Sequence, residues 1–156
     1  AREMTTADPT PLDNIADHLI NSAAIVGAAA DYGYSWTTLN VRPGPPVPSS
    51  VDTGEANAVP ADAVFIRPTG GLPVRQGRVE DVTEEASSYQ LLVRSKPNDF
   101  DAGHLLALAV YGAMIRPPAG FFRSEVFGGP PAWLEQDAQG HHLFVINVML
   151  WRTRGS

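Results

Sequence analysis

Apolar residues recur at helical spacing in two parts of the chain. In residues 10–33 they fall on one side of a helix that Thr10 can cap, that Pro11 suits as first residue, and that Gly33 ends. The second pattern covers residues 98–114, NDFDAGHLLALAVYGAM, and is apolar around much of its circumference. The chain is therefore predicted to form two principal helices, the second of them largely buried.

Period-two alternation predicts strands in the rest of the chain. In residues 87–95, SSYQLLVRS, Tyr89 and Leu91 face one way while Gln90 and Arg94 face the other. Residues 141–154, HHLFVINVMLWRTR, are apolar on both faces and are expected to form the longest strand. Such a strand is either central in its sheet or covered on one face by another subunit.

Weaker patterns predict further short strands. They fall in residues 36–42, 62–71, 75–82 and 123–129, with the second ending at Pro68 and a Gly-Gly turn. A turn at Gly140 is expected to precede the last strand. The order of elements predicts a single α+β domain over residues 1–156, with a mainly antiparallel sheet and two principal helices packed against it. Residues 1–9 are polar and expected to be frayed.

Residues 43–61, PGPPVPSSVDTGEANAVPA, form the least regular stretch. Their five prolines and two glycines do not fit an amphipathic helix or a strand ladder. A loop of this length in a small domain is uncommon and is often functional. Two interpretations remain open: a surface insertion, or a proline-stiffened arm that reaches a neighbouring subunit.

Composition narrows the class of function. The chain has no cysteine, which excludes disulfides, thiolate zinc sites and cysteine nucleophiles. No apolar run approaches the roughly 20 residues that span a bilayer, so we expect no membrane partner. The net charge of −6 argues against a protein that binds nucleic acid by neutralising phosphates, and fits a surface past which DNA slides.

The strongest candidate for chemistry is the cluster of Asp99, Asp101 and His104. These residue types can bind a divalent metal, but they also stand where the buried helix begins after Lys96-Pro97. Asp99 can cap the helix and Asp101 adds negative charge to its first turn, each contributing about 0.5–1 kcal/mol. The helix-start interpretation is preferred, with His104 near the surface.

Other polar groups suggest no catalytic site. His141 and His142 are adjacent on a strand and point to opposite faces, so one ion does not easily bind both. No phosphate-binding loop or serine nucleophile motif is present. The acids at positions 80, 81, 84 and 85 are expected to be a solvated charge run, with ion pairing between subunits to nearby arginines as an alternative. We therefore expect no enzyme activity, catalytic residue, metal or cofactor.

The order and texture of the segments resemble the tail terminator (minor capsid) proteins of long, non-contractile-tailed bacteriophages. The resemblance lies in the helix LDNIADHLINSAA, the Gly/Pro loop after it, the strand AVFIRPTGG, the strand and helix of residues 87–114, and the apolar-acidic segment that turns at Gly140 into the last strand. It covers about residues 12–153 and includes no catalytic signature.

The resemblance implies a virion protein, assembled in the host cytoplasm, that forms a six-fold ring at the head-proximal end of the tail tube. The ring would stop tube polymerisation and join the tube protein to the head-completion protein, while DNA passes through its lumen without specific binding. The expected contact surfaces are the 43–61 loop, the turn PTGGLPVRQGR and the exposed side of the last strand. The residues predicted at these contacts are Pro43, Pro45, Pro46, Pro48, Arg67, Arg75, Arg78 and Trp151.

Three alternatives remain open. The chain could be another head–tail joining protein or a tail-tube subunit. It could instead be a small metal-dependent hydrolase that uses Asp99, Asp101 and His104. A ligand-binding α+β domain of a bacterial host is the third alternative.

Overall fold

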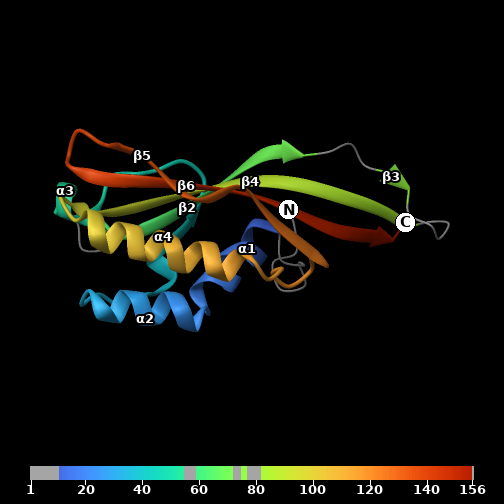
Figure 1. The fold of residues 1–156 in the computed structure, drawn as a ribbon, viewed down its shortest axis with the longest axis horizontal. Helices are drawn as coiled ribbons and strands as arrows, with labels where there is room; N and C mark the ends of the chain where they lie inside the picture. The colour runs from blue at the N-terminus through green and yellow to red at the C-terminus, as the bar shows by residue number, and fades with distance from the viewer. Residues whose placement is uncertain (1–10, 55–58, 72–74, 77–81, 156) are drawn as a thin grey trace, which may run out of the picture.

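The computed structural model describes residues 11–54, 59–71, 75–76 and 82–155, and Figure 1 shows α1, α2 and α4 on one face of a long, twisted sheet. The helical elements are α1 (Pro11–Ile20), α2 (Ala23–Asp31), the 3-10 turn η1 (Thr38–Asn40), the short α3 (Ser50–Thr53) and α4 (Phe100–Met114). The strands are β1 (Val41–Pro43), β2 (Ala63–Gly71), β3 (Arg75–Gln76), β4 (Val82–Pro97), β5 (Arg123–Gln136) and β6 (His141–Gly155). The predicted α+β class is confirmed. No helix among these residues has the length and apolar character needed to cross a membrane.

The sheet has the strand order β1-β2-β4-β6-β5, with β3 paired to the outer part of β4. Only β1 and β2 are parallel; the other pairs are antiparallel, as predicted. Strand β6 lies between β4 and β5, so the prediction of a central strand is confirmed, although β4 is one residue longer (16 against 15). The ribbon of β4 and β6 extends past the helices toward β3 and the C-terminus (Figure 1).

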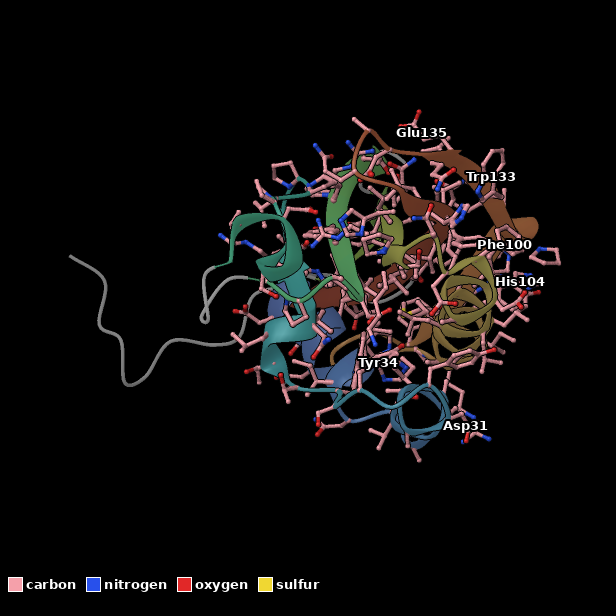
Figure 2. The ribbon with its side chains drawn as sticks, turned by 90° about the vertical axis from the view of Figure 1, so that its left-hand side faces the viewer. Asp31, Tyr34, Phe100, His104, Trp133 and Glu135 are labelled. Atoms are coloured by element: carbon pink, nitrogen blue, oxygen red, sulfur yellow. The ribbon has the colours of Figure 1, made fainter. Side chains whose placement is uncertain are left out.

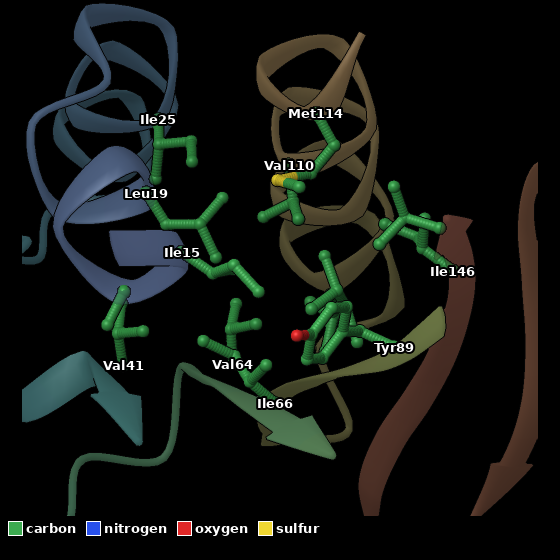
Figure 3. Close-up of a cluster of buried hydrophobic side chains, with 14 of the residues drawn as sticks. Ile15, Leu19, Ile25, Val41, Val64, Ile66, Tyr89, Val110, Met114 and Ile146 are labelled. Atoms are coloured by element: carbon green, nitrogen blue, oxygen red, sulfur yellow. The ribbon is translucent and has the colours of Figure 1, made fainter. Parts of the chain in front are cut away.

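The main core lies between the helices and one face of the sheet (Figure 3). Tyr89, Leu91 and Val93 of β4 face this core, as their alternation predicts. The remaining large members come from the helices, the strands and the segment after α4: Ile15, Leu19, Ile25, Val41, Val64, Ile66, Leu106, Val110, Met114, Phe121, Phe144, Ile146, Val148 and Leu150. Burying one such side chain contributes about 1.5–3 kcal/mol, so this layer supplies most of the stability.

The first predicted helix is divided into two. Helix α1 ends at Ile20, and α2 begins after Ser22, whose hydroxyl accepts a hydrogen bond from the Ile25 N–H at 3.4 Å. The Leu19 carbonyl, near the end of α1, accepts bonds from the Ser22 N–H at 3.3 Å and from the Trp36 indole at 3.0 Å. The cap at Ser22 therefore divides the helix, although the apolar pattern continues across this position. The predicted end of the helix at Gly33 is confirmed, and Gly33 has φ at +77°. The predicted cap Thr10 and the predicted frayed residues 1–9 lie outside the described residues.

Two strands run further than predicted, and one is shorter. Strand β2 continues through Pro68 to Gly71, because a register shift between Pro68 and Gly70 accommodates the missing N–H. Strand β5 continues beyond Gly129 to Gln136 across a similar irregularity. Of the predicted strand 36–42, only the last two residues are in β1. Of the predicted strand 75–82, Arg75 and Gln76 form β3 and Val82 begins β4, while residues 77–81 lie outside the described residues.

Candidate assembly interface

The cluster that raised the question of a metal site forms a helix start. Asp99 caps α4, its carboxylate accepting from the Ala102 N–H at 3.3 Å. Asp101 is exposed, and the exposed His104 ring packs between Phe100 and Phe144, with centroids 5.7 and 5.8 Å apart. Across residues 11–54, 59–71, 75–76 and 82–155, no three or more His, Asp or Glu residues are arranged to hold a metal. The helix-start interpretation is confirmed.

The two adjacent histidines point to opposite faces, as predicted. His141 is 1% exposed, and both ring nitrogens meet oxygen: Nδ1 lies 2.7 Å from the Ser95 carbonyl and Nε2 lies 2.8 Å from an Asp52 carboxylate oxygen. The bond to His141 is the main reason that the pKa of Asp52 is lowered. This long-range pair ties helix α3 to the start of β6, and sequence analysis missed it.

The same pair lies beside Ser49, which invites comparison with a serine nucleophile. The Ser49 hydroxyl is 2.9 Å from the Asp52 carboxylate and 3.5 Å from the His141 Nε2 atom. In a catalytic triad the acid and the nucleophile contact different ring nitrogens, whereas here both contact Nε2. Ser49 is also fully buried and caps α3. This group is a structural clamp on the loop.

Arg94 provides a second clamp. Its side chain is buried, lies 4.9 Å from the centre of the Phe65 ring, and donates to the carbonyls of Val47, Pro60 and Ala61, the last two at 2.9 and 3.0 Å. Val47 and Val59 then pack on the sheet face opposite the helices. The partners there are Phe65, Leu92 and Leu143. The described parts of the 43–61 loop therefore cover one end of the chain's own sheet.

The residues predicted at subunit contacts lie in three places. The four prolines are all exposed on the loop: Pro43, Pro45, Pro46 and Pro48. Arg67 is exposed at the far part of β2, where its guanidinium donates to the Gln90 side chain. Trp151 is half-buried on the same sheet face. The backbone of Arg75 lies in β3 but its side chain is outside the description, as is all of Arg78. The role of all eight residues in subunit contacts stays a prediction.

Arg67 and Trp151 belong to a surface that the loop does not reach, which we call the open face. It is defined by Phe127, Met149 and Trp151, with Arg123 and Glu125 beside them and Arg67 on the same face, two strands away from β6. The β5 and β6 residues line a hollow of about 280 Å³. The Arg123 guanidinium lies 4.6 Å from the centre of the Trp151 ring and 3.3 Å from the Glu125 carboxylate. Phe127 is 40% exposed. This is an apolar hollow with a charged rim.

A second apolar surface, which sequence analysis missed, lies at the other end of the sheet. We call it the aromatic edge and define it by Phe100, His104, Trp133 and Leu134. Figure 2 shows three of these side chains together on one side of the molecule, with Glu135 further along β5. Phe100 is 42% exposed, and Trp133 and Leu134 are each 52% exposed.

The Trp133 indole donates to Nδ1 of His142 at 3.1 Å, which fixes its position on the edge strand. The Phe100 ring packs edge-on against the His142 ring, and the two ring centroids are 5.3 Å apart. The only signal in the sequence was the large apolar pair of AWLEQD, which stands among polar residues. Large exposed aromatic residues on an edge strand are typical of protein contacts.

Comparison with known proteins identifies a shared fold. No family model matches the chain, and no curated protein matches its sequence. Its fold is similar to that of a chain in a solved structure described as "Virion of native gene transfer agent (GTA) particle", with a TM-score of 0.51. The likeness covers 92% of this chain and 95% of that one at 12% sequence identity. The similarity thus extends over nearly the whole of both chains and concerns the fold.

Proposed function

We propose that this chain is a structural protein of a phage-like virion, and within that class a tail terminator. The observation that carries the proposal is the fold that it shares, over nearly its whole length, with a chain of a gene transfer agent virion. The segments that resemble tail terminators in sequence are the same helices and strands that build this fold. The resemblance and the fold therefore support one class of protein.

The arrangement of polar groups also favours a non-enzymatic role. Asp99 is occupied in capping a helix, and the Asp52–His141 pair is occupied in holding the loop. The exposed features are apolar surfaces at the two ends of one sheet, which suit a subunit that works through contacts with other proteins.

The proposed mechanism is steric. Copies of the chain assemble into a ring, six-fold as in the proteins that it resembles, at the head-proximal end of the tail tube. Heterologous contacts that close on themselves give a ring and do not continue into a filament. One face of the ring complements the last layer of tube subunits, and the other offers no such edge and meets the head-completion protein. The net charge of −6 suits a lumen that DNA crosses without being held.

Electron microscopy of the purified protein, alone and mixed with the tail-tube subunits of the same particle, tests the proposal. We expect closed rings with a central hole, bound at one end of tubes that stop growing. Fibres of unlimited length from the protein alone would identify a tube subunit instead. Rings that bind the head-completion protein and leave tube growth unchanged would identify a different head–tail joining protein.

A further inference from the structure

We infer that neighbouring copies of this chain contact each other head to tail, with the aromatic edge of one copy against the open face of the next. The inference rests on the proposed function, since it specifies the contact that builds the ring. The aromatic edge of each copy is then covered by the open face of one neighbour, and its open face is covered by the aromatic edge of the other neighbour.

The positions of the two surfaces require two different copies. His142, which holds Trp133, stands near the start of β6, and Trp151 stands near its end. At about 3.3 Å per residue these positions are roughly 30 Å apart along the strand. The surfaces also lie on opposite sides of the sheet, because Trp133 pairs with the core residue Phe144 while Trp151 points away from the helices. One copy cannot bring its own two surfaces together.

Charge selects this pairing over a symmetric one. The aromatic edge carries the Asp101 carboxylate next to Phe100, which is exposed and, in the part of the chain that the structure describes, without an ion pair. Glu135 does not belong to this surface, because it pairs with Leu143 and faces the other side of the sheet. Two aromatic edges placed together would oppose their Asp101 carboxylates. The open face carries the Arg67 guanidinium, which is hydrogen-bonded to a neutral amide, while Arg123 and Glu125 neutralise each other. Placing the aromatic edge against the open face therefore brings an acidic side chain to a basic one, whereas placing two open faces together would bring two arginine side chains together.

Shape favours the same arrangement. Trp133 and Leu134 are the most exposed large apolar side chains of the edge strand. The open face offers a hollow of about 280 Å³ lined by Phe127, Met149 and Trp151. A projecting tryptophan that enters an apolar hollow is the kind of contact that dominates the binding energy of protein interfaces.

Charge reversal on both surfaces tests the pairing. Asp101→Arg places like charge against Arg67 of the next copy, and Arg67→Glu places like charge against the acidic edge. Each variant alone is expected to weaken assembly, measured by sedimentation velocity over a concentration series, by about tenfold, because one reversed contact is worth about 1.4 kcal/mol. An equimolar mixture of the two variants regains assembly, since their edges and faces are complementary in an alternating ring. Asp31→Arg, at the end of α2, and Arg116→Glu, after the end of α4, are exposed and away from both surfaces and serve as controls.

Crosslinking tests the same contact when assembly is weak. The chain has no cysteine, so Asp101→Cys and Arg67→Cys can be introduced without a background and joined with a short bis-maleimide. The double variant is expected to give a ladder of dimers, trimers and larger species, and each single-cysteine variant is expected to remain uncrosslinked. Dimers from a single-cysteine variant, or no ladder from the double variant, would overturn the inference.

The outcomes separate this inference from the proposed function. Wild-type rings that cap tubes, combined with charge variants that assemble normally, refute the contact and leave the function standing. A crosslinked ladder from a protein that never binds tubes supports the contact and refutes the tail-terminator function. Circular dichroism of each variant checks that loss of assembly is not loss of folding.

Discussion

Replacing Asp62 with asparagine is expected to stabilise the protein at neutral pH. Asp62 lies where the 43–61 loop joins β2 and is 2% exposed. Among the described residues, one of its carboxylate oxygens has no hydrogen-bond partner. The other lies 3.8 Å from the Lys96 ammonium, which is 41% exposed and therefore screened by water. Burial raises the pKa of Asp62 to about 6, and the attraction to Lys96 lowers it only in part.

The sign and size of the effect follow from the two pKa values. The carboxyl has a pKa of 3.8 as its ordinary value and about 6 in the folded chain, so the folded state holds this proton more tightly than the unfolded state. The contribution to stability is fully present below pH 3.8 and is lost as the pH rises through about 6. The shift of about two pKa units corresponds to about 3 kcal/mol at most. Asparagine carries no charge, so Asp62→Asn is expected to gain about 1–3 kcal/mol at pH 7.5.

Urea unfolding followed by tryptophan fluorescence at pH 7.5 and pH 4 measures this difference. The gain over wild type is expected at pH 7.5 and shrinks toward pH 4, where the wild-type carboxyl is largely neutral in the folded state. Asp31→Asn, at an exposed position, is the matched control and is expected to change stability by less than about 0.5 kcal/mol. A variant at Asp62 that loses stability at pH 7.5 would refute the reasoning, because the ion pair with Lys96 would then outweigh burial.

Three further substitutions test the fold. Asp52→Asn weakens the bond to His141 and is expected to cost about 1–3 kcal/mol at pH 7, and hydrogen exchange in residues 43–54 reports the loosened loop. Because the pKa of Asp52 is lowered from its ordinary value of 3.8, this difference is fully present above pH 3.8 and is lost as the pH falls through the lower pKa of the folded state. Ile146→Ala leaves a cavity in the core and is expected to cost about 2–5 kcal/mol in urea unfolding. Gly103→Ala places a methyl group 2.6 Å from the Ser95 Cβ atom and is expected to cost about 1–3 kcal/mol by overpacking; a neutral result would show that α4 can shift away from β4.

Features encoded by neighbouring residues could be predicted from the sequence. The start of α4 follows from Pro97 and Asp99, and the central place of β6 follows from apolar residues on both its faces. The break before α2 was missed because the apolar pattern continues across Ser22, and only the cap geometry decides between one helix and two. The path of β2 through Pro68 depends on a bulge, which hydropathy does not encode.

The candidate interface was predictable only in part, because it depends on pairing between distant segments. Arg67 and Trp151 were expected at contacts, and strand pairing places both on the open face. The aromatic edge joins Phe100 of α4 to Trp133 of β5, and their proximity becomes visible only when the sheet register is known. The clamp of Arg94 on the loop was missed for the same reason.

The clamp of Arg94 has a consequence for how the loop tolerates change. Among the described residues, every acceptor of its guanidinium is a main-chain oxygen, from Val47, Pro60 and Ala61. Side-chain identity matters little to such an anchor, so the outward-pointing prolines can be exchanged for other residues while the loop stays attached. The protein can therefore acquire a new outer surface at this end without rebuilding the sheet beneath it.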